Sequence, residues 1–139
     1  MSPYLWAILA SLAWGCAPIV EKLGLAKLPV WAGLFYRSLG VMFGALILFI
    51  FKYNEIKEAV TKDSTGWHLL AIGGFLASII GQIFFYNALK AGEASRVVPL
   101  GATYPLISFI LGIIFLKETM SMAKLGGLIF IILGAVLLR

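Results

Sequence analysis

The sequence has few charged residues and almost none of the residues that catalysis or metal binding needs. Only 12% of its 139 residues are charged, with one histidine, His68, and one cysteine, Cys16. A single cysteine excludes an intrachain disulfide, and the sequence contains no phosphate-binding loop, metal-ligand cluster or Ser/His/Asp set. We therefore expect no enzyme, metal or cofactor. The net charge of +5 is spread over separate segments, so nucleic acid is not an expected partner.

Hydrophobic residues dominate instead, at 62% of the chain, against about 45–50% in an ordinary soluble domain. A membrane-spanning helix needs about 20 mostly apolar residues. Five segments qualify to differing degrees: residues 3–20, 30–51, 67–89, 97–116 and 121–138. Strand-like alternation is absent, and lipid admits only helices or closed barrels. The sequence predicts an all-α integral membrane bundle of five transmembrane helices in one domain, residues 1–139, in the cytoplasmic (inner) membrane of the cell.

The segments that border the spans carry local signals. The N-terminal stretch lacks the basic region of a secretory signal and is interpreted as the first span. Residues 52–65 are polar, and Glu58 and Lys62 are spaced for a helical ion pair, which predicts one or two turns of interfacial helix. Gly92 is placed to end the third span. The fifth span is the shortest, so Lys124 and Arg139 are expected to snorkel outward from its ends.

Positive residues are balanced across the predicted membrane. Five spans place the termini on opposite sides, which assigns five positive residues to each side. The N-terminal side receives Lys52, Lys57, Lys62, Lys117 and Lys124, and the other side receives Lys22, Lys27, Lys90, Arg96 and Arg139. Because an excess of Lys and Arg sets orientation, this balance favours insertion both ways. The alternative is that local charges near one helix decide the orientation.

Arg37 lies inside the second span, where an arginine costs about 2.5–3.5 kcal/mol on insertion scales. The functional interpretation is that it faces a wet cavity and contacts an anionic or polar group. The structural alternative is that it snorkels to the nearer interface or donates to carbonyls of a neighbouring helix. No acid lies at the middle of a span. Glu21, at the end of the first span, could act as a coupling acid if that helix extends to Leu25, although a surface role is the preferred interpretation.

Other polar and aromatic side chains lie at depth in the predicted spans. With Arg37 they form a candidate substrate path: Trp14, Tyr36, Gln82, Tyr86, Asn87 and Tyr104. Such groups offer hydrogen bonds and aromatic faces to a partly apolar solute. The alternative for each is a bond between helices, usually worth less than about 1 kcal/mol.

Small residues and one proline predict how the helices pack. Gly40 with Gly44, and Gly74 with Ser78 and then Gly81, form small-residue faces that are interpreted as packing within the chain. Gly127 and Gly134 share one face of the last span, where contact with a second subunit is as plausible as packing within the chain. Pro105 removes the hydrogen bond to the Gly101 carbonyl and is predicted to kink the fourth span.

Nearly the whole chain resembles the EamA-type carriers of the drug/metabolite transporter superfamily. The resemblance rests on the order and spacing of short motifs: Trp14-Gly15, Pro29 followed by Arg37, Tyr86-Asn87-Ala88-Leu89-Lys90, Ala94-Ser95, Pro99, Pro105, Glu118, Gly126-Gly127 and Gly134. Most such carriers look like two five-helix repeats of opposite orientation, and this chain matches one. The resemblance therefore implies an antiparallel homodimer that rebuilds a ten-helix carrier.

The last span is also similar to the dimer-forming helix of the small multidrug resistance proteins. Those proteins have four spans and an essential glutamate in the first, and Trp14 occupies the place of that glutamate here. This departure puts their proton-antiport mechanism in doubt for the present chain.

Two hypotheses follow. The first is a secondary transporter of small metabolites or drug-like solutes, working by alternating access in the lipid bilayer. The second is an accessory or lipid-handling half-transporter subunit that pairs with another membrane protein. The sequence also leaves open a third hypothesis, in which the chain is an excised or designed repeat.

Overall fold

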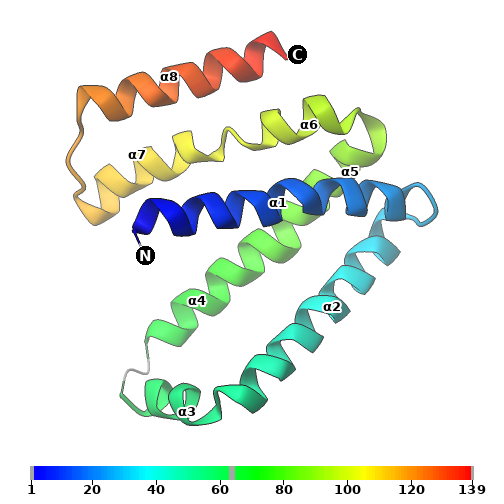
Figure 1. The fold of residues 1–139 in the computed structure, drawn as a ribbon, viewed down its shortest axis with the longest axis vertical. Helices are drawn as coiled ribbons and strands as arrows, with labels where there is room; N and C mark the ends of the chain where they lie inside the picture. Colours follow the sequence, from blue (N-terminus) through cyan, green and yellow to red (C-terminus); the bar gives the residue numbers. More distant parts are fainter. Residues whose placement is uncertain (1, 63–64, 139) are drawn as a thin grey trace. The chain divides into compact units, whose positions relative to one another are not determined.

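A computed structural model describes residues 2–62 and 65–138, and these residues form helices and no strands. The elements are α1 (Pro3–Leu25), α2 (Val30–Phe51), α3 (Tyr53–Lys62), α4 (Gly66–Phe75), η1 (Leu76–Gly81), α5 (Gln82–Ala91), α6 (Ala94–Gly101), α7 (Tyr104–Leu116) and α8 (Met122–Leu137) (Figure 1). Among these described residues, four stretches are long and apolar enough to cross a membrane: Pro3–Leu25, Val30–Phe51, Gly66–Ala91 and Ala94–Leu116. The all-helical class is as predicted, whereas α8 has only 16 residues, fewer than the roughly 20 that a span usually needs.

The chain divides into two compact units, which are described separately. One unit comprises residues 20–90, and the other comprises residues 1–19 with residues 91–139. The first unit contains the end of α1, then α2 to α5, with α3 joining α2 to α4 (Figure 1). The second unit contains the rest of α1 and the helices α6, α7 and α8.

Helix α1 is longer than predicted. The expected end was residue 20, because Glu21 and Lys22 are charged, but the helix continues to Leu25. Both charges are satisfied by neighbours within the unit: Glu21 pairs with Arg37, and Lys22 Nζ donates to the Leu89 carbonyl at 2.7 Å. A paired charge does not have to leave the helix for water, so the helix persists.

Helix α3 is also longer than the one or two turns predicted, with ten residues. The predicted ion pair between Lys62 and Glu58 is confirmed, with Nζ and Oε1 2.5 Å apart. The apolar residues Tyr53, Ile56 and Val60 recur at helical spacing, and none of the helix is buried. An amphipathic helix directly after a membrane span is typical of the lipid–water interface.

The third span combines α4, η1 and α5. The π-helical segment η1 widens the helix between Leu76 and Gly81, immediately before Gln82. Such segments occur often at functional sites because they displace side chains and backbone carbonyls from regular register. The helix ends at Ala91, directly before Gly92, as the sequence predicted.

The predicted fourth span is two helices rather than one. Helix α6 ends at Gly101 and α7 begins at Tyr104, with Pro105 in its first turn. Pro105 has no N–H to donate to the Gly101 carbonyl, and the helix is interrupted between Gly101 and Tyr104. The amide and hydroxyl of Thr103 both donate to the Leu100 carbonyl, at 3.2 and 2.8 Å. This carbonyl at the end of α6 therefore keeps hydrogen-bond partners.

A short turn reverses the chain from α7 to α8. Lys117 ends α7 with a left-handed backbone, φ 55°, and the Ser121 hydroxyl accepts from the Lys124 amide at 3.2 Å to start α8. Helix α8 then returns beside α6 (Figure 1). Lys124 Nζ donates to the Thr119 carbonyl in the turn, and the snorkelling expected of this residue stays a prediction. Arg139 lies outside the described residues.

The glycine faces of the first unit do not join its helices. A Cβ atom at Gly40, Gly44 or Gly74 would meet no atom of this unit within 4 Å, and one at Gly81 would meet only the Leu76 carbonyl, at 3.3 Å. The predicted packing through these faces is therefore wrong within residues 20–90. Gly33 provides the close approach instead, because a Cβ there would lie 2.8 Å from Leu25 Cδ2.

Candidate functional site

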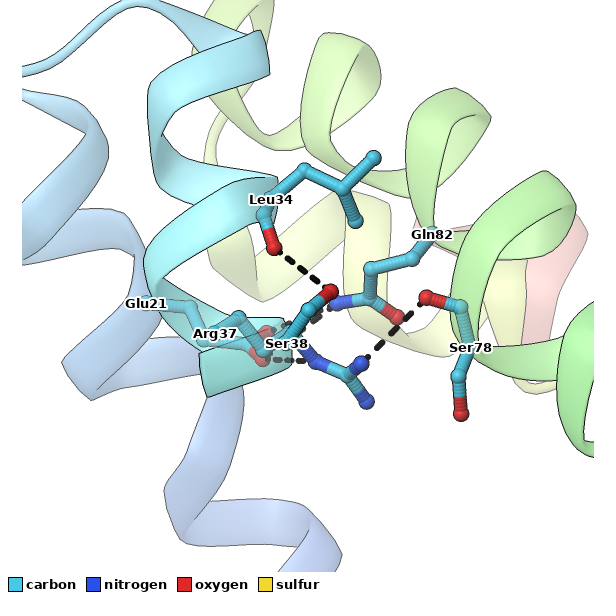
Figure 2. Close-up of polar contacts among 6 residues, drawn as sticks. All are labelled: Glu21, Leu34, Arg37, Ser38, Ser78 and Gln82. Atoms are coloured by element: carbon cyan, nitrogen blue, oxygen red, sulfur yellow. Dashed lines mark hydrogen bonds and ion pairs between the residues drawn. The ribbon is translucent and has the colours of Figure 1, made fainter. Parts of the chain in front are cut away.

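Three spans of the first unit bring a charged cluster together (Figure 2). The Glu21 carboxylate of α1 accepts a hydrogen bond from Arg37 Nε of α2 at 3.1 Å. The Gln82 amide of α5 donates to both carboxylate oxygens, at 3.3 and 3.2 Å. The side chains of Arg37 and Glu21 are only 26% and 17% exposed, so this ion pair is largely desolvated. We call Glu21, Arg37 and Gln82 the central cluster.

The geometry of the α1–α2 hairpin explains why these side chains meet. Glu21 lies four residues before the end of α1, and Arg37 lies seven residues after the start of α2. Because Cα–Cβ bonds tilt toward the N-terminus of a helix, the Arg37 side chain leans back toward the turn and reaches the depth of Glu21. Two charges that would each be costly in lipid thus neutralise each other.

The π segment supplies a further acceptor. Arg37 Nη1 donates to the Ser78 carbonyl of η1 at 3.4 Å (Figure 2). The Ser38 hydroxyl, one residue after Arg37, donates to the Leu34 carbonyl of its own helix at 2.9 Å and so does not compete for Glu21. The guanidinium is therefore held by a side chain from α1 and by backbone from η1.

A small apolar core supports the cluster from one side. Leu25, Tyr86 and Leu89 are 2%, 2% and 0% exposed, which makes them the most buried side chains among the described residues. The Tyr86 side chain also interacts with Glu21 and Gln82, so it links this core to the central cluster. Gly33 allows the start of α2 to approach Leu25 and the Tyr86 ring.

Two lysines link α5 to α1 and to the α1–α2 turn at the same end of the unit. Lys22 Nζ of α1 donates to the Leu89 carbonyl in the last turn of α5 at 2.7 Å. Lys90 Nζ of α5 donates in return to the Leu28 carbonyl of the α1–α2 turn, also at 2.7 Å. Carbonyls at helix ends have no partner within the helix and carry partial negative charge, so both contacts are favourable.

The structure joins only some of the residues predicted for the substrate path. Arg37, Gln82 and Tyr86 meet at the central cluster. Tyr36 is 60% exposed and packs edge-on against Phe35. The Asn87 amide donates to the Ile83 carbonyl of its own helix at 2.8 Å and does not reach the cluster.

Trp14 and Tyr104 belong to the other unit and are 68% and 55% exposed. Tyr104 lines a groove between α7 and α8 of about 580 Å³. The groove is lined by Tyr104, Pro105, Ser108, Phe109, Gly112, Leu116, Glu118, Lys124, Gly127, Leu128 and Ile131. The predicted kink residue and one of the two predicted dimer glycines therefore face the same groove. A Cβ at Gly127 or Gly134 would meet no atom of this unit within 4 Å.

Glu21 has a more central place in the structure than the sequence predicted. It was expected at the membrane surface, but it is the carboxylate on which the central cluster converges. A signal was present in the sequence, because an arginine inside a span needs a counter-charge and Glu21 is the acid nearest to the α1–α2 turn. The Ser78 carbonyl could not be found this way, since it depends on the π segment. No group of three potential metal ligands occurs within residues 2–62 and 65–138.

The chain matches one family of transporters over its whole length. The EamA-like transporter family matches residues 1–139. An uncharacterized protein of Methanocaldococcus jannaschii is 32% identical over 131 residues, which cover 94% of this chain and 91% of that protein. An uncharacterized transporter of a Sinorhizobium species is 27% identical, with 96% and 93% covered. No solved structure matches the chain.

A longer relative aligns with the chain over only part of its length. An uncharacterized transporter of Archaeoglobus fulgidus is 29% identical over 133 residues, which cover 96% of this chain and 45% of that protein. The chain therefore spans nearly all of two relatives and slightly less than half of a third.

Proposed function

Because the chain belongs to the EamA-like transporter family and is a multi-pass membrane transporter, we propose that it moves small metabolites or drug-like solutes across the cytoplasmic membrane by alternating access. The observation that carries the proposal is the central cluster. An ion pair that is mostly shielded from water within apolar helices is expensive to place in lipid, and in transporters such groups mark the solute or ion pathway. The proposed substrate path comprises Arg37, Gln82 and Tyr86, with Tyr36 and Asn87 as further candidates in the same unit. Trp14 and Tyr104, in the other unit, stay candidates from the sequence alone.

The working unit in this proposal is an antiparallel homodimer. Its support is that some relatives are about the length of this chain while another is about twice as long, as expected if two repeats can be separate or fused. The equal division of positive residues agrees with insertion in both orientations. Residues 1–139 would then form one five-helix domain, with α8 as the fifth span despite its 16 residues.

The second subunit would contact the open glycine face of α8. Gly127 and Gly134 lie on one side of this helix and have free space before them within their unit. Small residues allow close approach of membrane helices. A helix of the second subunit at this face would give the short helix α8 additional packing contacts.

Glu21 is the residue we assign to ion coupling, should transport be driven by protons or other cations. It is a partly buried carboxylate at the centre of the cluster, and binding of a cation there would release Arg37. Such exchange between a coupling ion and a fixed cation is one way to link ion binding to a change of conformation.

Solute flux into proteoliposomes tests the proposal. Removal of both Arg37 and Tyr86, as the Arg37→Ala/Tyr86→Ala variant, should reduce flux at least about tenfold, because the guanidinium and the phenol are lost from the path together. Lys62→Gln is the matched control: it breaks an exposed pair on α3 whose side chains are 74% and 63% exposed, and flux should not change. Unchanged flux in the double variant would refute the site. Absence of flux for every solute in the wild-type protein would favour the accessory-subunit alternative.

Cysteine labelling tests the dual orientation. In a Cys16→Ser background, Lys27→Cys in the α1–α2 turn and Lys57→Cys in α3 should each react with impermeant reagents from both sides of the membrane, in about equal amounts. Both lysines are exposed, and neither makes a contact that holds the central cluster. Labelling of each position from one side only would exclude an antiparallel homodimer.

A further inference from the structure

The central cluster has more unused hydrogen-bond donors than unused acceptors. An ionised carboxylate offers about four acceptor positions. Glu21 uses its two oxygens for Arg37 Nε and the Gln82 amide, and it also interacts with Tyr86. Little of its acceptor capacity therefore remains for a solute.

Arg37 has N–H donors that the central cluster does not use. A guanidinium carries five N–H donors. Within the part of the chain that the structure describes, Nε donates to Glu21 and Nη1 donates to the Ser78 carbonyl at 3.4 Å. The second terminal nitrogen, Nη2, makes no hydrogen bond to these residues. The side chain is 26% exposed, and no buried side-chain nitrogen among the described residues lacks a partner, so Nη2 is not fully buried.

From these observations we infer that the transported solute carries a carboxylate, which binds the free end of the Arg37 guanidinium while Glu21 holds its Nε side. This inference rests on the proposed function and names the substrate class of the same site. A carboxylate matches the planar fork formed by the two terminal nitrogens, with two parallel hydrogen bonds. Glu21 and Gln82 are positioning residues in this arrangement, since they orient Arg37 and need not touch the solute. Tyr36, adjacent to Arg37 in the sequence and 60% exposed, offers an aromatic face to the rest of the molecule.

The test uses 4-fluorobenzoate and 4-fluorobenzamide, which share a ring and differ in the charge of one group. Fluorine-19 NMR line broadening upon addition of the purified full chain in detergent measures binding of each probe. We expect the carboxylate to bind about tenfold more tightly than the amide, because its hydrogen bonds to Arg37 are charge-assisted. Arg37→Lys should lose most of this preference, since an ammonium keeps the charge but lacks the fork.

A second variant keeps the test decisive if Arg37→Lys does not fold. Glu21→Gln/Arg37→Gln leaves no unpaired charge, and its helicity can be checked by circular dichroism. Loss of carboxylate binding in this folded variant, with binding retained in Lys62→Gln, supports the inference. Equal binding of acid and amide, or carboxylate binding that survives in the double variant, overturns it while leaving transport intact. Selective carboxylate binding by a protein that shows no flux would instead overturn the proposed transport and leave the inferred site standing.

Discussion

Arg37→Gln is expected to lower the free energy of unfolding by about 2–3 kcal/mol and to reduce solute flux at least about tenfold. Breaking one partner of a fully buried ion pair costs about 3–5 kcal/mol, because the other charge stays desolvated without compensation. The pair here is 26% and 17% exposed, which places the expected cost below that range. Denaturant titration in mixed micelles, followed by circular dichroism, measures the change.

The companion variants separate the charge effect from simple loss of a side chain. Glu21→Gln/Arg37→Gln should recover part of the lost stability, since two neutral amides replace an orphaned carboxylate. Lys62→Gln breaks an exposed pair and should cost less than about 1 kcal/mol. Equal losses in the single Arg37 variant and the double variant would show that Glu21 is not stabilised by Arg37.

Gly33→Val is expected to destabilise the protein by about 1–3 kcal/mol, the usual cost of overpacking a well-packed site. An added Cβ would lie 2.8 Å from Leu25 Cδ2 and 3.5 Å from Tyr86 Cε2. Leu25 is only 2% exposed, so its side chain has little room to move aside. Displacement of Tyr86 would also disturb Glu21, and we expect flux to fall with stability.

Gly44→Val in the same helix is the matched control. It makes the same chemical change at a position where no atom of the unit lies within 4 Å. Both positions lie in α2, and valine is a better helix former than glycine, so the main unfavourable difference between the two variants is the contact at position 33. The thermal midpoint of unfolding should fall for Gly33→Val and change little for Gly44→Val. A similar decrease in both would mean that packing against Leu25 does not determine the effect.

Several features could be read from local sequence because they depend on local physics. Val30–Phe51 has the predicted bounds, since a long apolar run after Pro29 specifies both its start and its length. The Glu58–Lys62 pair follows from helical spacing alone. The interruption before Pro105 follows from the absence of an N–H group, although the sequence predicted a bend in one helix and not two separate helices.

Other features depended on contacts between segments. The end of α1 was misplaced because its charges are satisfied by partners 16 and 67 residues away along the chain, Arg37 for Glu21 and Leu89 for Lys22. The close approach at Gly33 was not singled out, while the more regular glycine pairs of α2 and α4 were. The spacing of small residues along a helix identifies a face that allows close packing. It does not identify which face contacts a neighbouring helix.

The apolar runs by themselves determined that this chain is a helical membrane protein, because lipid admits only helices or closed barrels and the sequence lacks the alternation of strands. The motif order likewise placed it among the EamA-type carriers. Only the tertiary structure decided that Glu21, Arg37 and Gln82 form one cluster and that the π segment presents the Ser78 carbonyl to it. The physical reason is that a charge in lipid must find a partner, but which partner it finds depends on how three helices are placed in space.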